Sequence, residues 1–234
     1  MTRQLTLKVG LSDLASFDNF HGGPNSEAVA AVRDMAGGRA GVLFLHGAVG
    51  TGKSHLLYAA VKESERLGRP AIYLSRAMVD SAAGEWLDLP GDGLVCIDDI
   101  GGALTRPEAR ALFSLYERIR SSAGSLVLSS RLAPGAIDWT LPDLCSRMQS
   151  DLVYRLFELA DRDLEAALRL RAGYRGIDLS DEVMRFVLRR YERSPVSLFR
   201  LLDRIDTESL AHKRRVTVPF LRTLAAAGDK AAQD

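Results

Sequence analysis

Residues 47–54, GAVGTGKS, restrict the fold of this chain more than any other segment. Two glycines separated by four residues and followed by Lys-Ser form a loop that belongs between a strand and a helix. The apolar run GVLFLHG (41–47) precedes the loop, and the amphipathic run KSHLLYAAVKESERLG follows it from Lys53. The sequence therefore predicts a strand–loop–helix unit at this point, as in proteins with a parallel sheet.

The same loop predicts that the chain binds a nucleotide. Its glycines let the backbone approach phosphate oxygens, and the N–H groups at the start of the helix point at the anion. Lys53 adds a positive charge for the β- and γ-phosphates, and the hydroxyl of Ser54 can bind Mg²⁺. We expect ADP or ATP, together with Mg²⁺, to be held by Gly47, Gly50, Thr51, Gly52, Lys53 and Ser54.

A second motif, LVCIDDI (94–100), is an apolar strand that ends in two aspartates. Asp98 suits a Mg²⁺ site, and Asp99 is placed to polarise an attacking water. Alone, two such aspartates are more often a solvated strand end. Their place after the phosphate loop favours the functional interpretation, with the strand AIYLS (71–75) between the two motifs. We expect that strand to mark the P-loop class with an additional strand between these motifs.

Strand-like and helical runs alternate through the first two thirds of the chain, and only helical runs follow. The further strand candidates are SLVLSS (125–130) and DLVYRLF (151–157). This order predicts an α/β fold, a parallel sheet with helices on both faces, followed by a small helical domain. We expect the α/β domain over residues 11–158, the helical domain over 159–227, a separate peptide over 1–10 and a flexible tail over 228–234.

Bulk composition excludes several classes of protein. The chain has 234 residues and a net charge of +1, which argues against a dedicated nucleic-acid binder. Its two cysteines, Cys96 and Cys145, have no metal-site or disulfide spacing. No apolar run approaches the ~20 residues of a membrane span, and no signal peptide is recognisable. We expect a cytoplasmic protein without a membrane partner.

Several of these segments together resemble the bacterial replication initiator DnaA. The stretches are FDNFHGGPNSEAVAAV (17–32), GTGKSHLLYAA, LVCIDDI and LPDLCSR (141–147), and the resemblance runs from about Phe17 to Leu224. It implies an AAA+ ATPase core with a helical lid, in which Phe20, Asn25 and His55 also contact the nucleotide. The DNA-binding domain of DnaA is not covered.

A DnaA-like AAA+ module headed by QLTLKV (4–9) resembles the regulatory inactivator of DnaA, the Hda/HdaA family. By periodicity alone this peptide is more often an ordinary edge strand or a frayed end. The resemblance implies that Gln4, Leu5, Leu7 and Val9 dock on the DNA polymerase III β sliding clamp.

The family resemblance also assigns catalytic candidates and exposes departures. Arg147 matches the arginine that AAA+ proteins project into the nucleotide site of a neighbour, whereas its surface alternative is an ion pair with Asp143. Ser129 or Ser130 is the polar sensor at the end of a strand. The lid arginine of DnaA falls on Val196, with Arg200 one helical turn later. The departure at Val196 puts the chain's own hydrolysis in doubt.

The resemblance implies a negative regulator of replication initiation, bound to ADP or ATP, that docks on the clamp and stimulates ATP hydrolysis by DnaA through Arg147. DNA would be contacted indirectly, and a homo-oligomer stays open. Two alternatives come from other classes: a self-sufficient AAA+ ATPase, and a helicase-loader-like protein acting on single-stranded DNA. The near-zero charge argues against the second alternative.

Overall fold

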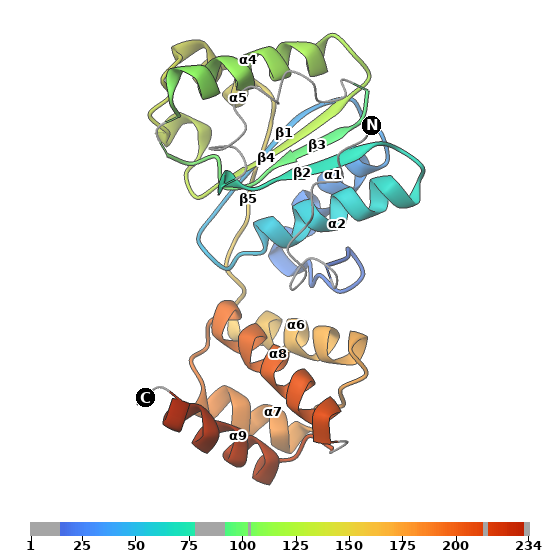
Figure 1. The fold of residues 1–234 in the computed structure, drawn as a ribbon, viewed down its shortest axis with the longest axis vertical. Helices are drawn as coiled ribbons and strands as arrows, with labels where there is room; N and C mark the ends of the chain where they lie inside the picture. Colours follow the sequence, from blue (N-terminus) through green and yellow to red (C-terminus); the bar gives the residue numbers. More distant parts are fainter. Residues whose placement is uncertain (1–14, 78–91, 103, 213–214, 232–234) are drawn as a thin grey trace. The chain divides into compact units, whose positions relative to one another are not determined.

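A computed structural model describes residues 15–77, 92–102, 104–212 and 215–231 of the chain. The chain divides into two compact units, Met1–Glu158 and Leu159–Asp234 (Figure 1). The clamp-binding residues expected from the sequence, Gln4, Leu5, Leu7 and Val9, lie outside the described residues.

The first unit is built on a five-stranded parallel sheet. Its strands are β1 (Gly41–His46), β2 (Ala71–Leu74), β3 (Leu94–Ile97), β4 (Ser125–Ser130) and β5 (Leu152–Arg155). Their order across the sheet is β2-β3-β4-β1-β5. Each strand lies within a run that the sequence predicts as strand, and the α/β fold class is confirmed.

The strand order corrects one expectation about the two motifs. The strand between them along the chain, β2, lies at an edge of the sheet. The strand that separates β1 from β3 in space is β4, which comes later in the sequence. Sequence order and sheet order differ because parallel strands are joined by crossovers that skip positions. The end of β4 therefore lies between the phosphate loop and Asp98.

Helices cover both faces of this sheet, as Figure 1 shows. One face packs against α1 (Ser26–Ala36), which the short helix η1 (Gly23–Asn25) precedes, and α2 (Lys53–Arg66). The other face packs against α4 (Arg106–Arg120) and α5 (Pro142–Ser150), with the short helix η3 (Pro134–Ala136) before α5. Along β1, Leu43 and Leu45 point to the first face, and Val42 and Phe44 to the second. This burial on both faces explains the continuous apolar runs of the inner strands.

The start of α4 is fixed by its own sequence. The Thr105 hydroxyl accepts the N–H of Glu108, and the Glu108 carboxylate accepts the N–H of Thr105 at 2.7 Å. Such a reciprocal cap satisfies two backbone donors that would otherwise lack partners. It gives α4 a defined first turn, and α4 also carries the residues that Arg147 of α5 contacts.

The second unit is helical and has a hydrophobic core of its own. It comprises α6 (Asp161–Tyr174), α7 (Asp181–Arg190), α8 (Pro195–His212) and α9 (Val218–Ala231). Leucines and valines at helical spacing meet at its centre, among them Leu164, Leu168, Val183 and Leu198. The helix α9 continues past residue 227, through part of the expected tail, to Ala231.

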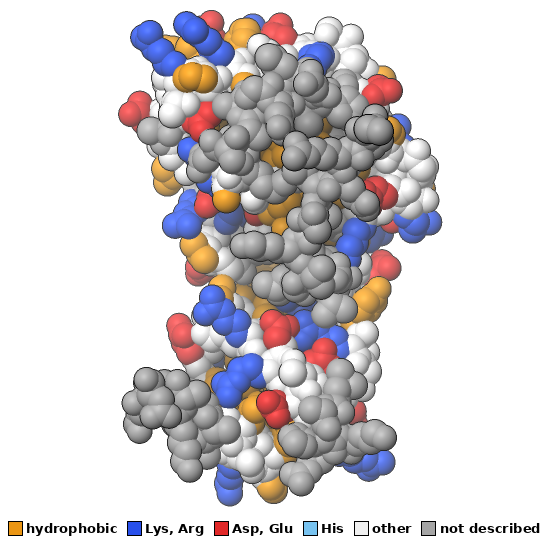
Figure 2. All heavy atoms as spheres, viewed as in Figure 1, with side chains coloured by type: hydrophobic (Ala, Val, Ile, Leu, Met, Phe, Trp, Pro, Cys, Tyr) orange, Lys and Arg blue, Asp and Glu red, His pale blue; other side chains and the backbone are white. Residues whose placement is uncertain are grey.

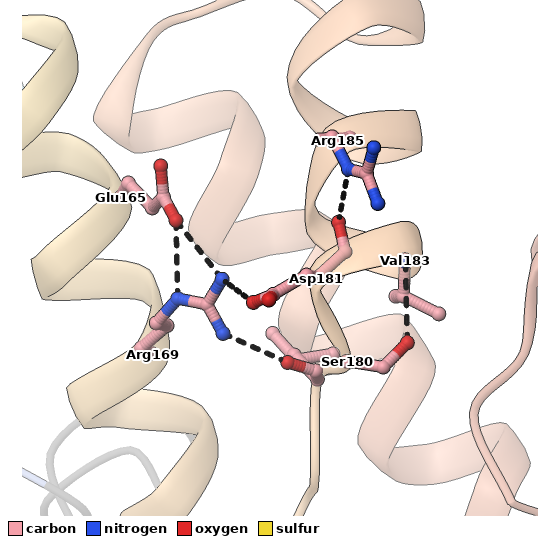
Figure 3. A network of polar contacts seen from close by, with 7 residues as sticks. Glu165, Arg169, Ser180, Asp181, Val183 and Arg185 are labelled. Carbon is pink, nitrogen blue, oxygen red and sulfur yellow. Dashed lines mark hydrogen bonds and ion pairs between the residues drawn. The ribbon is translucent and has the colours of Figure 1, made fainter.

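A polar network ties α6 to the beginning of α7 in this unit (Figure 3). The Arg169 guanidinium donates to Glu165 in the same helix at 3.0 Å and to Asp181 at 2.7 Å. The hydroxyl of Ser180 accepts the N–H of Val183 and so caps α7. The contacts of Arg169 on α6 and the cap at the start of α7 together stabilise the turn between the two helices.

Two surface properties bear on partners. On the face drawn in Figure 2, basic and acidic side chains are interspersed, in line with the net charge of +1. Within the described ranges, no helix is both long and apolar enough to cross a membrane.

Candidate functional site

The phosphate loop has the backbone geometry that its glycines permit. Gly50 and Gly52 have φ angles of 86° and 97°, in the left-handed region that side chains disfavour. A Cβ on Gly52 would lie 2.5 Å from the Phe20 ring, so this position also requires glycine for space. The helix α2 begins directly after it, and no side chain caps its first turn. The backbone N–H groups of this first turn can donate hydrogen bonds to a bound anion.

Lys53 lies against the inner side of the loop. Its Nζ donates to the carbonyl oxygens of Gly47 at 2.7 Å and of Ala48 at 2.8 Å. Burial lowers the pKa of Lys53, an effect that the nearby charges of Asp98 and Asp99 oppose. Thr51 also donates to the Ala48 carbonyl. The ammonium is thus held inside the loop that would wrap the phosphates.

The carboxylate of Asp98 is buried and receives two hydroxyl groups. Tyr73 of β2 donates to its Oδ2 at 2.7 Å, and Ser129 of β4 donates to its Oδ1. Ser129 is therefore the sensor candidate that reaches the acidic motif. The Ser130 hydroxyl instead accepts the N–H of Leu132. Sequence reasoning missed Tyr73, because its hydroxyl finds Asp98 only through the pairing of β2 with β3.

Asp99 has an unusual backbone. Its φ of 56° is the one left-handed angle at a non-glycine residue in the described part of the chain. Its N–H donates to the Ser129 hydroxyl at 3.0 Å, which holds this conformation. Its carboxylate forms an exposed ion pair with Arg131 at 3.7 Å. The side chain therefore projects from the strand end, whereas Asp98 remains buried.

The oxygens of Ser54 and Asp98 suit Mg²⁺. Magnesium prefers oxygen ligands and keeps water and phosphate oxygens in nucleotide sites, so it does not require a cage of protein side chains. No group of three or more His, Cys, Asp or Glu residues that could hold a metal is found among the residues described. The Ser54 side chain is exposed in the first turn of α2. The oxygen donors present therefore fit a nucleotide-bound Mg²⁺.

Residues expected around the nucleotide base have clear structural contacts. The Asn25 side chain pairs with the backbone of Phe157 in both directions, accepting its N–H at 2.7 Å and donating to its carbonyl at 3.0 Å. One ring nitrogen of His55 lies 2.9 Å from the Ser16 carbonyl, and the ring lies 5.3 Å from Phe20. The segment before α1 is thereby attached both to α2 and to the end of β5.

A cavity of about 350 Å³ opens beside the start of the phosphate loop. Basic groups line it from the ends of three strands, namely His46 of β1, Arg131 after β4 and Arg155 of β5. Burial lowers the pKa of His46, and the charges of Arg155 and Lys53 lower it further. Sequence reasoning gave Arg155 no role, because only the sheet order brings these strand ends together.

Arg147 lies on α5 and contacts α4. Its guanidinium pairs with Glu117 and lies 4.7 Å from the centroid of the Phe113 ring and 5.4 Å from that of Tyr116. The surface alternative, a pair with Asp143, is replaced by this contact with a residue 30 positions away. The side chain keeps 38% of its surface exposed, so it remains accessible to a partner.

The two lid positions lie in the other unit. Val196 is partly buried and Arg200 is exposed, both on α8. A role for Arg200 at the nucleotide stays a prediction.

Comparison with known proteins gives matches for both units. Residues 161–224 match the family model described as "Hda, lid domain". Domain III of the Thermotoga maritima replication initiation protein DnaA superposes with a TM-score of 0.72 at 23% identity, over 88% of this chain and 92% of that one. A replication initiator DnaA bound to AMPPCP and single-stranded DNA superposes with a TM-score of 0.68 at 21% identity, over 85% of this chain and 67% of that one.

The fold is also shared with a branch migration motor. The Thermotoga maritima RuvB Holliday junction branch migration motor has a TM-score of 0.66 at 19% identity, over 93% of this chain and 73% of that one. At such identities the structural matches establish the fold, and the family model covers residues 161–224. The chain thus joins a unit with the fold of the DnaA AAA+ core to a C-terminal segment that matches the Hda lid domain.

Proposed function

We propose that this chain is a negative regulator of replication initiation that acts on DnaA as a nucleotide-bound adaptor. The phosphate loop would hold ADP or ATP with Mg²⁺, and residues 1–10 would dock on the sliding clamp. Arg147 would then be offered to the ATP that DnaA binds. The match of residues 161–224 to the Hda lid domain supports the link to DnaA, and the loop geometry supports the nucleotide.

The observation that carries this proposal is the place of Arg147. Its contacts are with α4, on the face of the sheet opposite α2, which carries Lys53. An arginine placed there would serve a neighbour's nucleotide better than its own. Its planar fork of donors suits the charge that spreads over the phosphoryl oxygens during hydrolysis.

The test is hydrolysis of DnaA-bound ATP in the presence of clamp-loaded DNA. Both Arg147→Ala and Arg147→Lys are expected to lose most of the stimulation, because lysine lacks the fork. Arginine fingers in small GTPases contribute ~10³–10⁵ in rate, and a slower AAA+ partner would show less. Stimulation by Arg147→Ala within about twofold of wild type, under about 0.5 kcal/mol, would contradict the proposal.

Arg66→Ala is the matched control for this test. Arg66 is also an exposed helical arginine paired with a glutamate, Glu63 at 2.8 Å, but it lies on α2. We expect it to stimulate like wild type. Folding and ADP binding should be unchanged in all three variants. The contacts found for Arg147 and Arg66 among the described residues are not with the phosphate loop.

A self-sufficient ATPase is the second candidate, and Asp99 is the observation that favours it. Its exposed carboxylate follows the buried Asp98, and its backbone N–H donates to the Ser129 hydroxyl, which in turn donates to Asp98. A turnover assay on the protein alone, without clamp or DnaA, separates the two functions.

A further inference from the structure

Tyr73 lies beside the nucleotide site and has no role in the function proposed above. It belongs to β2 at the edge of the sheet, yet only 9% of its surface is exposed. A buried tyrosine hydroxyl requires a hydrogen-bond partner. Tyr73 finds this partner in Asp98, to which it donates at 2.7 Å.

The sheet register places Asp98 between two donors. Cys96 of β3 pairs with Tyr73 of β2, and Asp98 is the next residue on the same face as Cys96. On the other side, Ile97 pairs with Leu128 of β4, so that the following residues, Asp98 and Ser129, are neighbours. One hydroxyl therefore reaches each carboxylate oxygen, from a different strand.

Both hydroxyls are committed as donors. Ser129 accepts the N–H of Asp99 at 3.0 Å, so its single proton is available to Asp98. An ionised carboxylate can only accept hydrogen bonds, so the Tyr73 phenol is the donor in the other contact. The plane of the carboxylate is thus fixed at two points.

We propose that Tyr73 is a positioning residue that orients the Asp98 carboxylate toward the Mg²⁺ of the bound nucleotide. This inference rests on the proposed nucleotide function. A carboxylate oxygen can accept more than one hydrogen bond, so the pair of hydroxyls leaves further lone pairs for Mg²⁺ or its water. Partners that hold a metal-binding carboxylate in place typically change metal affinity by about 10–100-fold when removed.

A stacking contact links this orientation to the phosphate loop. The Tyr73 ring lies parallel to that of Tyr58 on α2, with 3.9 Å between centroids and 20° between planes. The same helix begins at Lys53 and carries Ser54. The element that would bind the phosphates therefore also fixes the ring that holds Asp98.

The test is ADP binding to the full chain, measured by calorimetry in EDTA and across a Mg²⁺ series. Tyr73→Phe keeps the ring and its stack but removes the donor. We expect it to raise the half-saturating Mg²⁺ concentration about 10-fold or more, with ADP affinity in EDTA unchanged. The matched control is Tyr116→Phe, since the Tyr116 hydroxyl also donates to an aspartate at 2.7 Å, Asp151, outside the site. It should leave both quantities unchanged.

Three results are decisive. Failure of the wild type to bind ADP, or binding that Lys53→Ala leaves intact, would overturn the nucleotide function itself. With wild-type binding intact, a Tyr73→Phe Mg²⁺ curve that matches wild type, or shifts to lower concentration, would overturn only the role of Tyr73. If Tyr73→Phe fails to fold, it is combined with Asp98→Asn, which removes the carboxylate charge that has lost its tyrosine donor. In that background it should have no further effect on the Mg²⁺ curve, and an additional shift would show that Tyr73 acts independently of Asp98.

Discussion

Arg131 and Asp99 form the residue-scale contact with the clearest consequence for hydrolysis. Arg131 stands at the end of β4, and its guanidinium lies 3.7 Å from the carboxylate expected to polarise water. Both side chains are exposed, at 64% and 42%, so the pair contributes at most about 1 kcal/mol. Even this small pairing would compete with a water molecule for the carboxylate oxygen.

We therefore expect Arg131→Ala to raise the chain's own ATP turnover by about two- to fivefold. The measurement is phosphate release by the isolated protein at saturating ATP and Mg²⁺. Arg155→Ala is the control, because Arg155 lines the same cavity but has Phe157 as its described contact. A fall in turnover for Arg131→Ala would mean that this arginine assists hydrolysis.

At the scale of elements, Asn25 joins the beginning of the first unit to the end of its last strand. It is 2% exposed, and both polar groups of its side chain bond to the backbone of Phe157, 132 positions away. The family resemblance assigns Asn25 to the nucleotide, whereas these contacts favour a role in holding the segment before α1 against the end of β5.

Asn25→Ala is expected to destabilise the nucleotide-free protein by about 1–3 kcal/mol, because the two hydrogen bonds of a buried side chain are lost, each worth about 0.5–1.5 kcal/mol. Thermal or urea unfolding without ligand measures the effect. Ser26→Ala, at the next position, removes a single exposed hydrogen bond to Gly23 and should cost less. An Asn25 variant that is as stable as wild type without nucleotide, and weakened only in ADP binding, would restore the purely ligand-binding role.

The same scale shows what the sequence could and could not predict. Local patterns were sufficient for the strands, the helices and the phosphate loop, because apolar period, glycines and caps act over a few residues. The order of strands was not predictable in this way. The partners that depend on it, Tyr73 with Asp98 and Glu117 with Arg147, come from segments 25 and 30 residues apart. No local spacing encodes such contacts.

At the scale of the whole molecule, the expected functions lie in separate parts of the chain. The core residues that the structure describes begin at Ala15, and each unit buries its own set of apolar side chains. The peptide that we expect to bind the clamp, Gln4 to Val9, precedes Ala15 in the sequence. Docking on the clamp should therefore be separable from nucleotide binding and from the action of Arg147.

Replacing both Gln4 and Leu7 by alanine is the change that tests this separation. We expect binding to the clamp to be lost, because the glutamine and an apolar anchor would supply much of the affinity of so short a peptide. Stability and ADP affinity should match wild type, since terminal segments usually contribute little to the core of a domain. Clamp binding is measured by surface plasmon resonance, and stimulation of DnaA is measured as ATP hydrolysis in the presence of clamp-loaded DNA.

Thr2→Ala with Thr6→Ala is the control, because it changes two polar positions of the same segment and leaves the expected anchors in place. A double variant at Gln4 and Leu7 that binds the clamp with near-native affinity would contradict the docking role. A variant that loses the clamp but still stimulates fully would instead show that Arg147 reaches DnaA without tethering.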